Sequence, residues 1–121
     1  MSEVVVLGAG VAGHTAASFL RKWLSKDHDV TVVSPLPSYN WIPSNIWLGL
    51  GRMREDQVIF DLAPVYQRAG IRFEMARAVE LHPEGNTEMA SPHVVVERRA
   101  GESFEHVNVS YEGVIGWKRK P

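Results

Sequence analysis

The order of apolar and polar residues predicts alternating strands and helices in the first part of the chain. Residues 4–7 form an uncharged, β-branched run ending at Gly8, which is typical of a strand buried on both faces of a parallel sheet. From Val11 to Lys26 the apolar residues recur at helical spacing, which predicts an amphipathic helix. A second β-branched run covers residues 30–33 and stops before Pro35. Together these segments predict a strand, a helix and a second strand.

Weaker patterns predict the elements that follow. Residues 35–53 contain three prolines, which predicts a long structured loop with room for a short helix near Trp47. The segment Asp61–Ala69 is predicted as a helix that begins with Asp61 as its cap and ends at Gly70. Residues 71–75 alternate between apolar and polar side chains, as expected of a third strand.

The second half of the chain predicts a small antiparallel excursion. Two strand-like runs at residues 94–97 and 106–109 are joined across residues 100–101, which suggests a hairpin. We place this excursion at residues 85–110, within one domain that covers residues 1–121. No internal repeat and no low-complexity tract interrupts the domain.

One glycine motif in the sequence indicates chemistry. Residues 8–13 read Gly-Ala-Gly-Val-Ala-Gly, which is G-x-G-x-x-G directly after a predicted strand and at the start of a predicted helix. In this context Gly8 permits the turn, Gly10 lets the backbone approach a pyrophosphate, and Gly13 lets the helix pack closely. The free N–H groups at the helix N-terminus bind the anion. The predicted fold class is therefore α/β and Rossmann-like, with a mostly parallel sheet flanked by helices and a small antiparallel hairpin.

The acidic residue that usually accompanies this motif is absent. An Asp or Glu about 20 positions downstream, at the end of the second strand, ordinarily binds the ribose hydroxyls of NAD. No acidic residue lies between Asp29 and Glu55, and the strand-end position is Ser34. No arginine directly follows Ser34 to accept the 2′-phosphate of NADP. The sequence therefore weakens both nicotinamide interpretations.

Composition and charge exclude several classes of function. Thirteen Lys and Arg residues against fourteen Asp and Glu give a net charge of −1, so nucleic acid is not an expected partner. Because the chain has no cysteine, it has no disulfide, no thiol nucleophile and no dithiol redox pair. The five histidines have no metal-ligand spacing, and neither a metal site nor a catalytic residue is predicted. The acidic start and the absence of a long apolar run predict a cytoplasmic protein.

Several segments together resemble a known family. They are VVVLGAGVAG at 4–13, VTVVSP at 30–35, YNWIPSN at 39–45, GLG at 49–51, IRF at 71–73 and AVELHP at 78–83. This combination resembles the N-terminal flavin-binding part of sulfide:quinone oxidoreductases, whose broader relatives are flavocytochrome c sulfide dehydrogenases and type II NADH dehydrogenases. A serine at the end of the second strand is familiar in that family.

The resemblance implies FAD as cofactor and a set of residues that bind it. The pyrophosphate would lie against the glycine motif, at Gly8, Gly10, Val11, Ala12 and Gly13. The adenosine ribose would lie beside Ser34 and Pro35, and the adenine would contact the backbone of Ala78. The ribityl chain or isoalloxazine would lie near Pro43, Ser44 and Asn45. The chemistry implied is two-electron oxidation of sulfide by FAD with transfer to a quinone. It also implies peripheral attachment of the complete protein to the inner face of a membrane.

Relative to the family, the chain is incomplete, and catalysis by these residues alone is not expected. The strands that later parts of the family chain supply are missing, so we expect one side of the strand at residues 4–7 to be unpaired. Such an open edge favours a homo-oligomer. Two alternatives stay open, namely a non-catalytic dinucleotide-binding or interaction module and a ligand-free fragment prone to assembly.

Aromatic and imidazole side chains near the motif allow two interpretations. His14 follows the last motif glycine, where it either faces a cofactor or is a packing or solvated residue. Tyr39, Trp41 and Trp47 either shield a flavin or quinone face or form the aromatic core of their own loop. The sequence does not decide between these possibilities.

Overall fold

A four-stranded parallel sheet forms the centre of the molecule. The computed structural model describes residues 3–40 and 45–115. Its central strands are β1 (Glu3–Leu7), β2 (Asp29–Ser34), β5 (Arg72–Met75) and β9 (Gly113–Ile115). Their order is β5-β2-β1-β9, with every pair parallel. This arrangement confirms the predicted α/β class.

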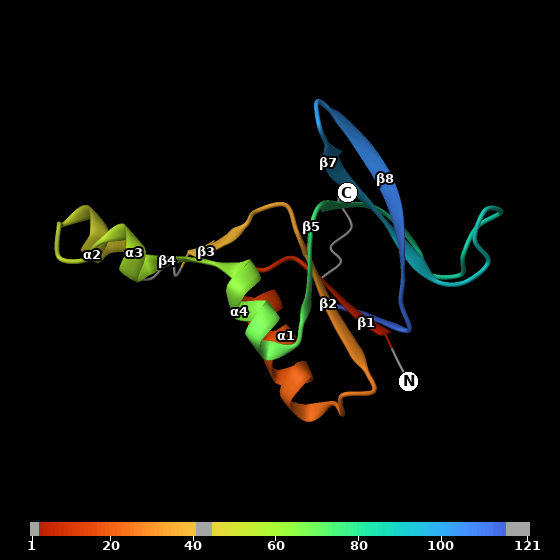
Figure 1. Ribbon diagram of the computed structural model, residues 1–121, viewed down its shortest axis with the longest axis horizontal. Helices are drawn as coiled ribbons and strands as arrows, with labels where there is room; N and C mark the ends of the chain where they lie inside the picture. The colour runs from red at the N-terminus through yellow and green to blue at the C-terminus, as the bar shows by residue number, and fades with distance from the viewer. Residues whose placement is uncertain (1–2, 41–44, 116–121) are drawn as a thin grey trace.

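Two helices cover one face of this sheet (Figure 1). They are α1 (Val11–Trp23) and α4 (Leu62–Ala69). The core on this side contains Val6, Val30 and Val32 from the strands, together with Ala17, Leu62 and Tyr66 from the helices. Alternate strand residues point to the opposite face, as the β-branched runs predicted for strands buried on both sides.

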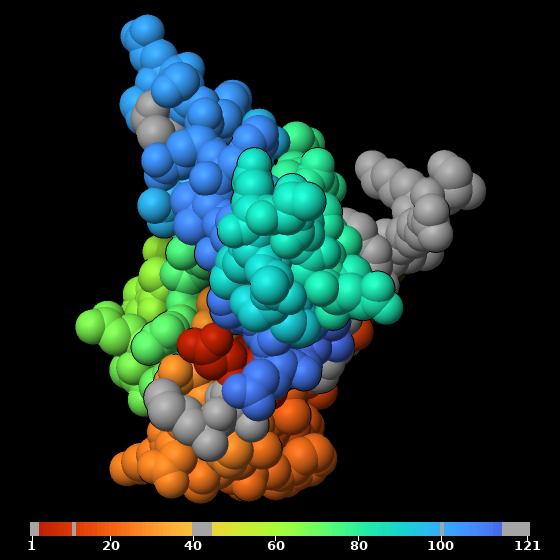
Figure 2. All heavy atoms as spheres, turned by 90° about the vertical axis from the view of Figure 1, so that its right-hand side faces the viewer, coloured from red at the N-terminus to blue at the C-terminus, as the bar shows by residue number. Residues whose placement is uncertain are grey.

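An antiparallel sheet covers the other face of the parallel sheet. It contains β6 (Arg77–His82), β7 (His93–Ala100) and β8 (Ser103–Ser110), in that order. Val94 and Val96 pack against Val5 and Val33. The hairpin predicted across residues 100–101 is confirmed, and β6 joins it, so the antiparallel segment begins at Arg77 rather than at residue 85. Figure 2 shows the β7–β8 hairpin rising above the body, with the β6–β7 loop in front.

The predicted long loop forms an arm that projects from the body (Figure 1). Strands β3 (Ser38–Asn40) and β4 (Ile59–Asp61) pair antiparallel at its base. Between them lie two short helices, α2 (Asn45–Gly49) and α3 (Glu55–Val58). The short helix expected near Trp47 is present as α2. Because β3 and β4 are only three residues long, no alternation predicted them.

The expectation that β1 is unpaired on one side is wrong. Strand β9 pairs with β1 opposite β2, with Val4 beside Gly113 and Val6 beside Ile115. Tyr111 is buried in the core, and the Glu112 N–H donates to the Glu3 carbonyl at 2.8 Å. These contacts return residues 111–115 to the sheet. Within residues 3–40 and 45–115, the two outer strands of the parallel sheet are therefore β5 and β9.

Two helix ends differ in detail from the sequence expectations. Helix α1 stops at Trp23, because Leu24 adopts extended backbone angles, and so does not reach Lys26. Asp61 occupies the N-cap position of α4, but its side chain makes no capping hydrogen bond. Gly70 ends this helix as predicted, with a φ of 76° that favours glycine.

Candidate functional site: a glycine turn at the carboxyl edge of the sheet

The glycine motif forms the turn between β1 and α1. Gly8 has a φ of 102°, a conformation that side chains other than glycine rarely adopt. Its N–H donates to the Val33 carbonyl at 2.7 Å, which attaches the turn to the end of β2. The N-terminus of α1 therefore lies at the carboxyl edge of the parallel strands, where ligands bind in open α/β sheets.

Gly13 has a packing role within the fold. A Cβ atom at this position would lie 2.1 Å from the carbonyl oxygen of Gly8. That distance is far below any van der Waals contact, so α1 can approach the turn this closely only with glycine at position 13. The close helix–strand packing expected of the third motif glycine is thus explained within the chain itself.

Gly10 is different, because nothing within the described structure requires a glycine there. Its φ of −76° and ψ of −165° are ordinary extended angles, and a Cβ atom would meet no other atom within 4 Å. The open space above Gly10 lies at the start of α1, where the first helical hydrogen bond runs from the His14 N–H to the Gly10 carbonyl. This space suits a ligand that closely approaches the backbone.

The helix start has the electrostatics of an anion site. Gly10 caps α1 without a side-chain hydrogen bond, and the first turn contains no acidic residue. The first-turn N–H groups of Val11, Ala12 and Gly13 precede the first intrahelical hydrogen bond. Together with the helix dipole they favour a bound anion such as a pyrophosphate.

The predicted adenosine side lies next to this turn. Ser34 ends β2 and is 4% exposed, and its hydroxyl is held in a local turn by two 3.2 Å hydrogen bonds with the backbone of Leu36. The Ser34 carbonyl accepts from the Ala76 N–H at 3.0 Å, which brings the start of β6 to the same edge. Pro35 borders a hollow of about 420 Å³ there. The ribose role of Ser34 and Pro35 stays a prediction.

A β-bulge lies at the predicted adenine contact. The register between β6 and β7 shifts between Ala78 and Glu80, which leaves Val79 without a paired residue in β7. Bulges of this kind redirect backbone groups and are common beside binding sites. Because β6 is an outer strand of its sheet, one backbone edge of Ala78 has no neighbouring strand within the described sheet.

The remaining predicted residues belong to the arm. Asn45 begins α2 and is exposed, and Figure 1 places this helix away from the carboxyl edge of the parallel strands. Pro43, Ser44 and Trp41 lie outside the described residues. The structure therefore brings together the glycine turn, Ser34, Pro35 and Ala78, but not Asn45.

His14 is a packing residue, which decides between its two interpretations. Its Nδ1 lies 2.8 Å from the hydroxyl of Tyr66, and its ring lies 4.9 Å from that of Tyr39 and 5.9 Å from that of Phe60. Tyr39 therefore belongs to an aromatic core. Trp47 is 46% exposed on α2. The helical spacing of the sequence is consistent with this position, because His14 lies one turn before the buried Ala17 and so on the same face of α1.

Burial shifts the titration of both partners in this hydrogen bond. It lowers the pKa of His14 below its ordinary value. Burial, with a smaller effect from Tyr39, raises the pKa of Tyr66 to about 12. Both groups are therefore neutral near pH 7. Because the Tyr66 hydroxyl is buried and requires an acceptor, we assign Nδ1 as that acceptor, which places the proton of the neutral imidazole on Nε2.

The lowered pKa of His14 predicts a loss of stability in mild acid. Well above the ordinary histidine pKa of about 6.5, the histidine is neutral in both the folded and unfolded chains, so its contribution is fully present. As the pH falls toward the lower folded pKa, the unfolded chain takes up a proton that the folded chain does not. Urea unfolding from pH 8 to pH 5 should show a steeper decline for the wild type than for His14→Asn, which keeps an acceptor but does not titrate. Parallel curves would contradict this assignment.

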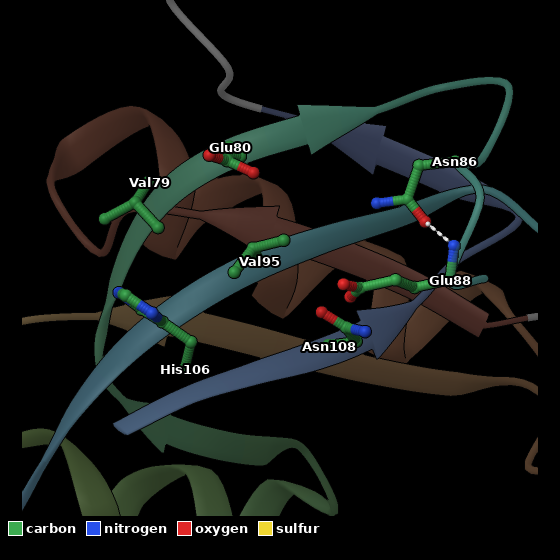
Figure 3. A pocket seen from close by; sticks show the side chains of 7 residues that line it. All are labelled: Val79, Glu80, Asn86, Glu88, Val95, His106 and Asn108. Carbon is green, nitrogen blue, oxygen red and sulfur yellow. Dashed lines mark hydrogen bonds between the residues drawn. The ribbon is translucent and has the colours of Figure 1, made fainter. Parts of the chain in front are cut away.

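Another hollow, of about 450 Å³, lies on the antiparallel sheet (Figure 3). Its lining residues are Val79, Glu80, Asn86, Glu88, Val95, His106 and Asn108. The Asn86 side-chain oxygen accepts from the backbone N–H of Glu88 at 3.1 Å. With two carboxylates and no lysine or arginine in the lining, this hollow disfavours a pyrophosphate. The glycine turn is therefore the better candidate for a nucleotide site.

The described residues contain neither a membrane-spanning helix nor a cluster of metal ligands. Across residues 3–40 and 45–115, no helix is both long enough and apolar enough to span a membrane. In the same ranges, no group of three or more His, Asp or Glu residues could hold a metal ion.

Comparison with known proteins supports the resemblance seen in the sequence. No family model matches the chain. The sulfide-quinone reductase of Aquifex aeolicus is 32% identical over 85 residues, which cover 70% of this chain and 20% of that protein.

Solved structures share the fold. The sulfide:quinone oxidoreductase of Aquifex aeolicus matches with a TM-score of 0.74 and 24% identity, over 94% of this chain and 23% of that one. The water-forming NADH oxidase of Lactobacillus brevis matches with a TM-score of 0.72 and 20% identity, over 100% of this chain and 26% of that one. The chain is therefore related to sulfide-quinone reductases and has the α/β fold of these oxidoreductases, of which it spans about a quarter of the length or less.

Proposed function

We propose that this chain is the FAD-binding portion of a flavin-dependent oxidoreductase of the sulfide:quinone type. The main observation behind this proposal is the conformation of Gly10. Neither its backbone angles nor its surroundings within the described structure require glycine, whereas close approach of a pyrophosphate does. The relationship to sulfide-quinone reductases supports a flavin rather than a nicotinamide as the dinucleotide. The serine at the end of β2, where NAD-binding proteins use an acid, agrees with this choice.

The residues present fit the cofactor. The first-turn N–H groups of Val11, Ala12 and Gly13 would bind the pyrophosphate, and Gly8 and Gly10 leave room for it. Backbone groups at Ser34 and Pro35 would border the ribose, and those at Ala78 the adenine. Pro43, Ser44 and Asn45 would approach the flavin side. When bound, FAD would supply two-electron transfer from sulfide to a quinone.

This chain supplies binding and orientation rather than the sulfur chemistry. It contains no cysteine to receive sulfide sulfur, so that step would require residues outside these 121. In the complete architecture, the chain would hold the adenosine and pyrophosphate. We place the complete protein in the cytoplasm, attached peripherally to the inner face of a membrane. A homo-oligomer would then use β9, the outer strand beside β1.

Equilibrium dialysis against four ligands tests this assignment. FAD and ADP should both bind, because they share the adenosine and pyrophosphate that the glycine turn recognises. FMN should not bind measurably, since it lacks both groups. NAD contains the same adenosine and pyrophosphate as ADP but lacks the flavin, so it should bind no more tightly than ADP and more weakly than FAD. Preference for NAD over FAD would favour a dinucleotide-sensing module, and binding of none of the four would favour a ligand-free fragment.

A further inference from the structure

The arm and the glycine turn meet at one half-buried side chain, His14. It lies in the first turn of α1, four residues after Gly10, to whose carbonyl its N–H donates at 2.9 Å. Its ring contacts three other elements through Tyr39 of β3, Phe60 of β4 and Tyr66 of α4. No other side chain with ring contacts in the described residues links α1 to both strands at the base of the arm.

The base of the arm has few other attachments. Strands β3 and β4 pair only with each other among the described strands. One backbone hydrogen bond, from Leu62 to Pro37 at 2.9 Å, joins the two ends of the arm. Helix α2 has no buried residue. The direction in which the arm projects therefore depends on how β3 and β4 pack onto the body, and the ring cluster around His14 provides that packing.

The hydrogen bond between His14 and Tyr66 fixes the orientation of the imidazole. Tyr66 is fully buried, so its hydroxyl needs an acceptor, and Nδ1 of His14 lies 2.8 Å away. A ring held at one edge keeps its tilted contact with Tyr39 and its edge contact with Phe60, whose two rings lie 5.0 Å apart. A hydrophobic side chain of similar size could fill the space but would lose this orientation.

We propose that His14 is a positioning residue that holds the arm in a fixed direction relative to the N-terminus of α1. The inference rests on the proposed function, in which the glycine turn binds the pyrophosphate and the arm, which projects away from that turn, extends toward the flavin side of FAD. Loss of the His14–Tyr66 hydrogen bond would then weaken contacts with the flavin half of the cofactor. Contacts with the adenosine and pyrophosphate would be kept.

The affinities for FAD and ADP test whether His14 affects contacts with the flavin half of the cofactor alone. In His14→Phe and in Tyr66→Phe, the dissociation constant for FAD should rise about fivefold, the size of one net hydrogen bond, whereas that for ADP stays unchanged. His14→Asn should also lose FAD affinity, because its side-chain oxygen can accept from Tyr66 but it has no ring to pack against Tyr39 and Phe60. Tyr39→Phe is the matched control, since it keeps the ring contact and leaves the His14–Tyr66 bond intact. An equal loss of FAD and ADP affinity, or no loss, would overturn the proposal.

A ligand-free measurement separates this inference from the proposed function. Hydrogen exchange of amides at residues 45–58 should be about fivefold faster in Tyr66→Phe and His14→Phe than in the wild type and Tyr39→Phe, with β1 and β2 unaffected. Unchanged exchange in the arm would overturn the positioning role even where FAD binds. If wild-type protein binds neither FAD nor ADP, the proposed function fails, and the exchange result alone decides whether His14 holds the arm.

Discussion

Replacing Gly10 with valine is expected to abolish FAD binding while lowering the free energy of unfolding by no more than about 1 kcal/mol. The backbone angles at Gly10 suit any residue, and a Cβ there meets no atom within 4 Å, so the folded chain accommodates the side chain. The added methyl groups would occupy the space that a pyrophosphate needs beside the first-turn N–H groups. Titration calorimetry with FAD and urea unfolding measure the two effects.

Gly113→Val provides a matched control for the Gly10 variant. Gly113 begins β9 and pairs with Val4, at the edge of the sheet opposite the glycine turn. A Cβ there would lie 3.9 Å from the Val4 side chain, an ordinary contact. This variant should bind FAD as the wild type does. Undiminished FAD affinity in Gly10→Val would contradict the placement of the pyrophosphate.

Replacing Gly13 with alanine is expected to have the opposite pattern, with a large loss of stability. The new Cβ would lie 2.1 Å from the Gly8 carbonyl oxygen, so α1 or the turn must move. Overpacking of this kind should lower the free energy of unfolding by about 3 kcal/mol. Because the movement displaces the helix N-terminus, FAD affinity should fall as well. Thermal and urea unfolding monitored by circular dichroism measure the change.

Gly49→Ala is the matched control for Gly13→Ala. Gly49 ends α2, and a Cβ there meets no atom within 4 Å, so the same substitution should leave stability equal or up to about 1 kcal/mol higher. Wild-type stability in Gly13→Ala would show that α1 does not pack against the turn as described. The Gly10 and Gly13 variants together separate the ligand requirement of the motif from its folding requirement.

Local pattern was sufficient for the centre of the fold. The β-branched runs that became β1 and β2 alternate between the two cores, with Val6 and Val32 facing the helices, and Val5 and Val33 facing the antiparallel sheet. Burial on both faces gives an uninterrupted apolar run, which is a strong signal even in a short segment. The same periodicity located α1, and a left-handed Gly70 located the end of α4.

Long-range pairing explains what the sequence could not predict. Strand β9 has only three residues, and it pairs with β1, which lies more than 100 residues earlier in the sequence. No local pattern in the sequence therefore indicated that β1 would be paired on this side. Strands β3 and β4 are equally short, and the two α helices of the arm separate them. In each case the partner strand, rather than the segment itself, determines the structure.

The candidate site was predictable in part for the same physical reason. A turn that needs a positive φ at Gly8 and no side chain at Gly13 leaves a fixed spacing in the sequence. The hydrogen bond between His14 and Tyr66 joins residues 52 positions apart, and no local pattern links them. The hydroxyl of Ser34 hydrogen-bonds to the backbone of Leu36, which competes with hydrogen bonding to a ligand. A serine at the end of a strand does not by itself predict this local turn.

FAD binding at the glycine turn can be tested by the visible absorption spectrum of the purified chain, recorded after incubation with excess FAD and removal of free cofactor. Wild-type protein and Gly10→Val should be compared side by side, with released flavin quantified after acid treatment. Wild-type protein should show a bound-flavin spectrum at close to one FAD per chain, and the variant should show none. Equal flavin content in both proteins, or none in the wild type at any FAD concentration, would contradict FAD binding at the glycine turn.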